Sequence, residues 1–240
     1  MKELPYHKQL DQIILQIQNE MQENEKHKKP SLLLHACCGP CSSYVLEYLA
    51  KFFDITIYYY NPNIHPSEEY HRRLTELKKF LTQFPEAIKN SVKLIEEIYN
   101  PEEYFSATKT LEQPELQTEP EKGERCRRCY ELRMRKAYEY ANNHSFEWFT
   151  TTLSISPHKD AEKINTIGKN LQNEKESEYK IKNLEISRIT KYLPSDFKKR
   201  GGFLRSTQLS KEYGLWRQDY CGCIYSKQNS PRQKTENQSR

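Results

Sequence analysis

The stretch LLLHACCGPCSS, residues 32–43, decides the fold of this chain. Its short apolar run, bounded by Gly and Pro, is typical of a buried strand, and the serine pair before the apolar residues of Val45–Leu49 indicates the start of a helix. Cys37, Cys38 and Cys41 are therefore expected at a strand-to-helix turn. In an open α/β sheet such turns lie at the carboxyl ends of the strands, where ligands bind, and the first-turn N–H groups of a helix favour thiolate over thiol. We expect the active site at this edge.

Outward from this turn, strand patterns alternate with helical spacings of apolar residues. The alternation predicts an α/β protein with a Rossmann-like parallel sheet, right-handed crossovers and helices on its faces, followed by a cysteine-rich C-terminal segment. The strands are expected at Leu32–Leu34, Ile55–Tyr60, Val92–Ile95, Phe146–Leu153 and, with the weakest pattern, Leu184–Ser187.

The two ends of the chain differ from its centre. Residues 1–30 are expected to hold an amphipathic helix that lies on the core, because apolar residues recur there at helical spacing: Leu10, Ile13, Ile14, Ile17 and Met21. Residues 31–226 are expected to form one α/β domain, since 240 residues allow one substantial core. Residues 227–240 are small, polar and charged, which predicts a disordered tail.

Composition narrows the class of function. No apolar run is long enough to span a bilayer and no secretory signal pattern is present, so we expect a cytoplasmic protein with no membrane partner. In a reducing compartment, a count of seven clustered cysteines indicates metal or redox chemistry. The net charge of +5 mildly favours a polyanionic partner, although a merely soluble surface explains it equally well.

A second cysteine pair follows the loop expected at Glu112–Glu124. Cys126 and Cys129 are three residues apart at the start of a predicted helix, so both can face one metal or cluster. Together with the first turn they suit zinc or an iron–sulfur cluster. Three alternatives stay open: a structural zinc site, buried inert thiols, and a thioredoxin-like oxidoreductase using Cys38 and Cys41.

The third group is Cys221-Gly222-Cys223. A bond between these two sulfurs would close a small strained ring, and strain makes a disulfide easier to reduce. This suits a two-electron relay better than a structural disulfide. Two further metal ligands, or two free thiols, are the alternatives.

Five motifs in order along the chain resemble the QueH-type epoxyqueuosine reductases. The resemblance runs from about Leu32 to Ser226 and rests on His35–Pro40, Tyr60–Pro66 with Glu69 and Tyr70, Arg125–Tyr130, Thr151–Leu153 with Ser156–Lys159, and Arg217–Ser226. It implies a HUP-type fold and an enzyme that reduces epoxyqueuosine to queuosine at the wobble position of tRNAs with GUN anticodons, using an electron donor that the sequence does not identify.

The resemblance also implies roles for the cysteines, position by position. Cys37, Cys38, Cys126 and Cys129 match the ligands of a [4Fe-4S] cluster, and Cys221 with Cys223 match a redox-active disulfide pair. The family also allows an additional iron ion, for which Cys41 is the first candidate ligand. Removing the epoxide oxygen as water takes two electrons and two protons, which a cluster plus a dithiol supplies.

Two expectations concern nucleotides. The chain lacks the Ser-Gly-Gly-x-Asp-Ser phosphate loop of the ATP-dependent tRNA-thiolating enzymes of similar architecture, so no ATP dependence is predicted. An anticodon base can stack on Tyr59, Tyr60 or His65. Candidates for phosphate contacts along one edge, with an ordinary solvated surface as the alternative, are Arg72, Arg73, Arg125, Arg127, Arg128, Lys198, Lys199, Arg200 and Arg205.

Overall fold

Five parallel strands form the centre of the fold, in the spatial order β3-β2-β1-β4-β5. The structure is a computed structural model that describes residues 3–23 and 28–228. The strands are β1 (Ser31–His35), β2 (Asp54–Tyr59), β3 (Lys93–Glu96), β4 (Trp148–Thr151) and β5 (Lys191–Tyr192). The predicted α/β class and parallel sheet are confirmed. The strand order reverses between β1 and β4, and the carboxyl ends of strands at such a point form the usual ligand crevice.

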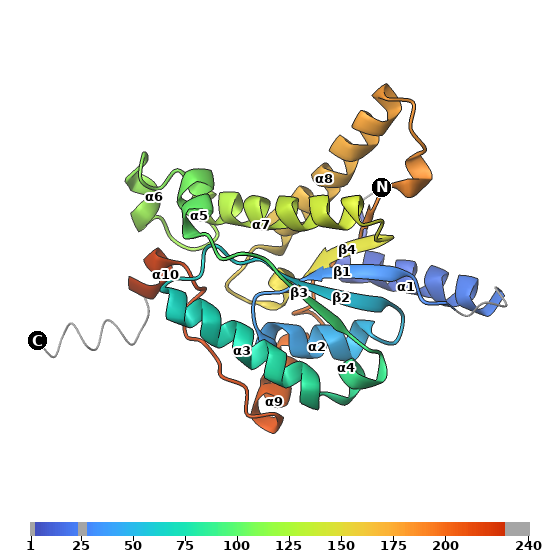
Figure 1. The fold of residues 1–240 in the computed structure, drawn as a ribbon, viewed down its shortest axis with the longest axis horizontal. Coiled ribbons are helices and arrows are strands. Elements are labelled where there is room, and N and C mark those ends of the chain that lie inside the picture. The colour runs from blue at the N-terminus through green and yellow to red at the C-terminus, as the bar shows by residue number, and fades with distance from the viewer. Residues whose placement is uncertain (1–2, 24–27, 229–240) are drawn as a thin grey trace, which may run out of the picture.

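Helices cover both faces of the sheet (Figure 1). The side chains of β1 alternate between two apolar clusters, because Leu32 and Leu34 join one and Leu33 joins the other. The first cluster is closed by α2 (Gly39–Leu49), α3 (Ser67–Gln83), α4 (Pro85–Lys89) and α9 (Gly202–Glu212), and the second by α7 (Glu124–Asn143) and α8 (Ala161–Ile181). The sheet is therefore buried on both sides, as continuous apolar strands require.

The N-terminal helix packs on this core. In α1 (Tyr6–Glu23) the side chains of Leu10, Ile14 and Ile17 are buried in the first apolar cluster, as the amphipathic pattern predicts. At one end of the molecule α5 (Pro101–Thr108), α6 (Glu115–Thr118) and α10 (Ile224–Gln228) gather near the start of α7 (Figure 1). No helix among the described residues combines the length and the apolar character needed to cross a bilayer.

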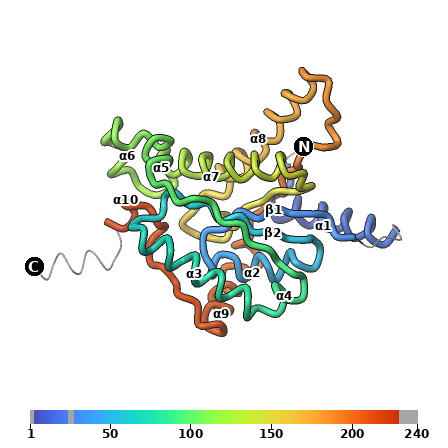
Figure 2. The backbone as a smooth tube through the Cα atoms, viewed as in Figure 1, coloured from blue at the N-terminus to red at the C-terminus, as the bar shows by residue number. Residues whose placement is uncertain are grey.

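The chain between α9 and α10 runs alongside α3 (Figure 2). The backbone N–H of Trp216 donates to Glu76, and Arg73 donates to the carbonyls of Tyr220 and Cys221. These contacts carry the C-terminal cysteines from the far side of α2 back to the carboxyl edge of the sheet.

Several sequence-based boundaries differ from the structure. The strand predicted at Leu184–Ser187 is wrong: Ile186–Arg188 is a 3-10 turn, with Leu184 50% and Ile186 44% exposed, and the last strand is β5. The strand predicted at Phe146–Leu153 ends at Thr151, where a 3-10 turn (Thr152–Ile155) begins. Of the predicted tail, residues 227–228 belong to α10, and the rest lies outside the described residues.

Candidate active site

Polar side chains tie together the carboxyl ends of β1, β2 and β4. His35 Nε2 lies 3.1 Å from the carbonyl oxygen of Tyr60, and His35 Nδ1 lies 2.8 Å from Thr151 Oγ1. Burial lowers the pKa of His35 to about 3, so the ring is neutral. Its single proton serves the Tyr60 carbonyl, which can only accept. His35 is therefore a structural residue that fixes the turn, with no proton to spare for a substrate.

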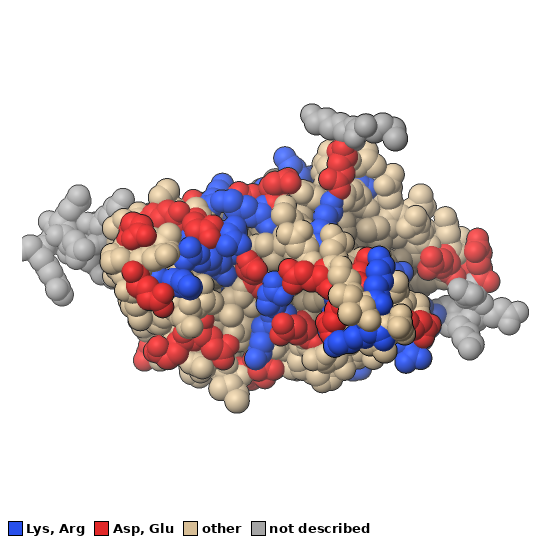
Figure 3. Space-filling view, turned by 90° about the horizontal axis from the view of Figure 1, so that it is seen from above, with Lys and Arg blue, Asp and Glu red and all other residues tan. Residues whose placement is uncertain are grey.

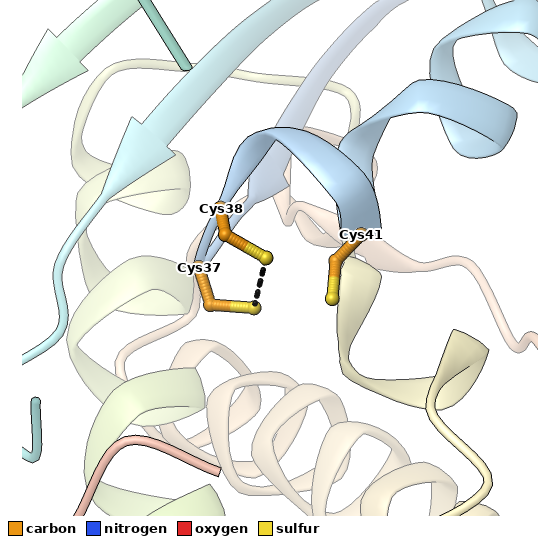
Figure 4. Close-up of side chains that lie close together, drawn as sticks. All are labelled: Cys37, Cys38 and Cys41. Carbon is orange, nitrogen blue, oxygen red and sulfur yellow. Dashed lines mark hydrogen bonds between the residues drawn. The ribbon is translucent and has the colours of Figure 1, made fainter. Parts of the chain in front are cut away.

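Three thiols gather at this turn. Cys37 and Cys38 follow β1, Cys41 lies in the first turn of α2, and their three sulfurs lie within 4.8 Å of one another (Figure 4). The Cys37 and Cys38 sulfurs are 3.8 Å apart, and Gln218 Nε2 lies 3.2 Å from the Cys38 sulfur. Among the described residues, no other group of three or more His, Cys, Asp or Glu side chains brings its possible metal-ligand atoms within 4.8 Å of one another.

Hydrogen bonds and nearby charges give these three thiols different pKa values. Hydrogen bonds from Cys38 and Cys41, together with the charges of Lys159 and Arg133, hold the pKa of Cys37 well below its usual range. Donating to Cys37 raises the pKa of Cys38 to about 11, and the pKa of Cys41 is raised for the same reason. Cys37 is thus the most acidic of the three thiols, and binding a metal would release the protons that the group still holds.

The second pair, Cys126 and Cys129, lies in the first turns of α7 and is buried. The Glu119 carboxylate, on the loop before this helix, accepts hydrogen bonds from the backbone N–H groups of Glu124 and Arg125, both at 2.8 Å. It thereby satisfies two first-turn donors of α7 and fixes the direction in which the helix starts. Burial raises the pKa of Cys126 to about 11 and that of Cys129 to about 12.

The C-terminal pair is split between two surroundings. Both thiols are free, and Cys221 is half-buried and lines a cavity. Cys223 is buried in a small apolar cluster with Tyr104, Cys129 and Tyr225. The structure thus brings one thiol of this pair to the second cysteine pair and leaves the other facing the cavity.

Two buried cations lie between the cysteine groups. Arg133 acts electrostatically on Cys37, Cys129 and Cys221, and Lys159 acts on Cys37, Cys41 and Cys221. Arg133 is 1% exposed; its Nη2 donates to Asn61 Oδ1 at 2.6 Å, while its Nε has no hydrogen-bond partner in the part of the chain that the structure describes. A buried guanidinium with a spare donor requires negative charge nearby, and sulfur is what surrounds it.

The cavity opens beside these groups at the carboxyl edge. It has a volume of about 610 Å³, which suits a nucleoside-sized ligand. Cys41, Lys159 and Cys221 line it, and Phe203 and Arg217 contribute from α9 and the segment after it.

Comparisons with known proteins place this chain in a family. The family model described as epoxyqueuosine reductase QueH matches residues 32–229. The chain is 42% identical over 200 residues to the epoxyqueuosine reductase QueH of Streptococcus pyogenes, covering 82% of this chain and 71% of that protein. Identity to the enzymes of the same name from Staphylococcus epidermidis and Haemophilus influenzae is 40% and 35%, with 83% and 92% of this chain and 77% and 80% of those proteins covered. The chain belongs to the epoxyqueuosine reductase QueH family. It is thus an enzyme of an oxidoreductase family, and the resemblance seen in the motifs is confirmed.

Most of the arginines and lysines expected to contact phosphates form hydrogen bonds or ion pairs within this QueH-family chain. Arg73 and Arg125 are buried and donate to backbone carbonyls, so their assignment as phosphate contacts is wrong. Four exposed or half-buried arginines and one lysine pair with carboxylates: Arg127 and Arg128 with Glu124, Lys198 with Asp196, Arg200 with Asp11, and Arg205 with Glu47. On the face shown in Figure 3, basic and acidic side chains interleave.

The predicted base-stacking residues fare differently from one another. Tyr59 and Tyr60 are buried within the sheet and its edge, so neither presents a face to a nucleotide. His65 is half-buried. Of the phosphate candidates, Arg72 and Lys199 are exposed and have no carboxylate partner within the described residues, and Arg72 stacks on the Trp216 ring at 3.6 Å.

The sequence analysis gave no role to either buried cation. Arg133 lies four and seven residues after Cys129 and Cys126, so helical spacing puts all three on one face of α7. That spacing was an available signal. For Lys159 the signal was its place in the Ser156–Lys159 motif, but nothing in that motif showed that the side chain is buried.

Proposed function

We propose that this protein reduces epoxyqueuosine to queuosine at the wobble position of tRNAs with GUN anticodons, in the cytoplasm. The names of its relatives support the reaction. The cavity supports it physically, because Cys221, Cys41 and Lys159 line one chamber of nucleoside size. A wobble nucleotide turned out of the anticodon stack would enter this chamber.

Cys37, Cys38, Cys126 and Cys129 are the proposed ligands of a [4Fe-4S] cluster, and Cys41 is proposed to bind an additional iron. The donor chemistry fits: all five are soft sulfur ligands, and the Arg133 guanidinium beside them keeps a free buried donor. When bound, a cluster delivers electrons singly and an iron with an open position acts as a Lewis acid toward an oxygen.

Cys221 and Cys223 are the proposed two-electron reservoir. Oxidation of the dithiol to a disulfide releases two electrons and two protons, which equals the demand of converting an epoxide into an alkene and water. Cys221 faces the cavity and Cys223 packs beside Cys129, so the pair extends from the substrate chamber to a proposed cluster ligand.

Lys159 is proposed to hold the departing oxygen. It is only 7% exposed and lines the cavity. Burial by itself would lower the pKa of Lys159, but the charges of the neighbouring cysteines raise it, so the side chain stays protonated. A fixed cation at the position where an epoxide oxygen gains negative charge stabilises the transition state.

One experiment tests the cofactor and the reaction together. The protein is purified without oxygen, its iron, sulfide and zinc are measured, and it is incubated with tRNA containing epoxyqueuosine and a chemical reductant; nucleosides are then analysed by mass spectrometry. We expect about four or five irons per chain and conversion to queuosine. A Cys221→Ser variant is expected to keep its iron and bind tRNA without turnover.

A zinc-stapled tRNA-binding module is the second candidate. Ligands at about 2.3 Å from a tetrahedral zinc lie about 3.8 Å apart, and the Cys37 and Cys38 sulfurs are separated by 3.8 Å. Zinc without iron or sulfide, together with tRNA binding and no turnover, would replace the reductase proposal with this one.

A further inference from the structure

The two thiols of Cys221-Gly222-Cys223 differ sharply in access. Cys221 is half-buried and lines the cavity. Cys223 is 6% exposed, is absent from the cavity wall, and packs against Tyr104 and Cys129. Gly222 between them has φ of +127°, a conformation that side-chain-bearing residues rarely adopt. A reagent in solution therefore meets one sulfur of the pair and not the other.

We infer that the cavity is also the binding site of a low-molecular-weight thiol that re-reduces the Cys221–Cys223 disulfide by attacking the sulfur of Cys221. This inference rests on the proposed function, since it supplies the electrons that the reaction consumes. Because substrate and reductant both need Cys221, they bind in turn.

The exchange is balanced in atoms and electrons. The thiolate of the reductant bonds to Cys221 Sγ, the Cys221–Cys223 bond breaks, and Cys223 leaves and takes up a proton. A second thiol then attacks the reductant's sulfur in the mixed disulfide, releasing Cys221 as a thiol. Two thiols become one disulfide, and the protein gains two electrons and two protons.

The surroundings of Cys223 suit a leaving sulfur. The backbone N–H of Ser226 donates to Cys223 Sγ at 3.4 Å, while the Ser226 hydroxyl donates to the Cys223 carbonyl. A hydrogen bond from an N–H group stabilises negative charge on sulfur as the bond breaks. Access decides the direction: Cys221 lines the cavity and Cys223 does not, so Cys221 is the sulfur that is attacked and Cys223 the one that leaves.

A buried cation in the cavity points independently to an anionic ligand. The Lys159 ammonium makes no hydrogen bond or ion pair with any residue in ranges 3–23 and 28–228, although only 7% of this residue is exposed. It lies close enough to Cys221 to act on its charge. An incoming thiolate would give this ammonium a hydrogen-bonded anionic partner inside the cavity.

Substrate and reductant need the same wall of the cavity, where Cys221 lies. At about 610 Å³ it admits a nucleoside or a small thiol, and its rim includes Glu121 and His158 3.9 Å apart. Cys221 lines this chamber, so a nucleotide seated there would cover the sulfur that a reductant must reach.

Alkylation of the reduced, iron-loaded protein tests the access geometry. Trypsin cleavage after Arg217 and Lys227 gives a peptide, Gln218–Lys227, whose only cysteines are Cys221 and Cys223. With limiting iodoacetamide and fragmentation by mass spectrometry, we expect Cys221 to be labelled at least about tenfold faster than Cys223. Saturating anticodon stem-loop RNA is expected to slow labelling of Cys221 by a similar factor.

Single-cysteine variants test the direction of attack. Exposed to glutathione disulfide, Cys223→Ser is expected to form a mixed disulfide at Cys221, while Cys221→Ser stays unmodified at Cys223. With dithiothreitol as the sole reductant, turnover should follow ping-pong kinetics, and excess tRNA should inhibit competitively against dithiothreitol.

The outcomes separate this inference from the proposed function. Equal or faster labelling of Cys223, or labelling of Cys221 that RNA leaves unchanged, overturns the shared chamber even if epoxyqueuosine is still converted. Selective, RNA-sensitive labelling of Cys221 without any conversion to queuosine keeps the chamber and overturns the reductase assignment.

Discussion

The two faces of α7 differ in how their arginines are neutralised. On the outer face, Arg127 and Arg135 pair with glutamates at 2.6–3.2 Å. On the inner face, Arg133 is 1% exposed, and no carboxylate of the described residues lies within ion-pair distance of it. Burying an unpaired cation is costly, so its balance must come from other anions. The surrounding groups are the thiols of Cys37, Cys129 and Cys221. The comparison teaches that one helix neutralises its arginines in two ways: Arg133 in the core faces sulfur, whereas Arg127 and Arg135 on the surface pair with carboxylates.

The largest expected effect comes from removing the inner charge. Arg133→Met is expected to lower the stability of the metal-loaded protein by about 3–5 kcal/mol, because it leaves buried thiolates and Asn61 without their cation. Iron content and the thermal unfolding midpoint measure this. The matched control is Arg127→Met on the outer face of the same helix, with an expected loss below about 1 kcal/mol. Equal losses for the two variants would remove the distinction between the faces.

The second effect concerns the cation in the cavity. Lys159→Gln is expected to lower kcat about 100-fold while iron content stays unchanged, since a positioned charge at a developing oxyanion is worth that much. Lys159→Arg should recover part of the rate. The control is Lys163→Gln: Lys163 lies in the first turn of α8, is not part of the cavity wall, and donates to the carbonyl of Lys122. Loss of iron in Lys159→Gln would instead make Lys159 a structural partner of the metal ligands.

The sequence predicted those parts of the site whose signals lie close together along the chain. The strand-turn-helix at residues 32–49 follows from an apolar run, a Gly-Pro pair and helical spacing, all of which are short-range. Grouping Cys37 with Cys38 and Cys41 follows from the same turn. The four ligands proposed for the cluster, including Cys126 and Cys129, remain a prediction.

Long-range packing decided what sequence missed. β5 has two residues, Lys191 and Tyr192, and its apolar neighbours Leu184 and Ile186 attracted the strand assignment although they are exposed. Arg73 resembled a phosphate ligand because arginine is usually exposed. Its burial follows from the C-terminal segment, about 150 positions later in the chain, lying across α3.

The third effect compares two glycines with positive φ. An alanine Cβ at Gly222 would lie 3.0 Å from Arg73 Nη1 and 3.1 Å from Ile64 Cγ1, whereas at Gly214 it would meet nothing within 4 Å. Gly222→Ala combines backbone strain with contact, and we expect a loss of about 1–3 kcal/mol in chemical denaturation. Gly214→Ala, at φ of +60°, should lose about 1 kcal/mol, from the backbone conformation alone. A smaller loss at Gly222 than at Gly214 would mean that the 220–223 segment is loosely held.

The smallest effect belongs to the outer face. Arg135 Nη1 lies 2.7 Å from Glu174 Oε2, joining α7 to α8, and both side chains are substantially exposed. The hydrogen bond from Arg135 lowers the pKa of Glu174. The pair therefore stabilises the fold fully above the pKa of an unfolded glutamate, about 4.3. This stabilisation is lost as the pH falls through the lower pKa of the folded state. Because water and salt screen exposed pairs, Glu174→Gln should cost below about 1 kcal/mol at pH 7. Denaturation of both proteins at pH 7 and pH 4 measures the difference, which should shrink at the lower pH. A larger loss, or one that grows at pH 4, would show that carboxylates outside the core do more than neutralise their arginines.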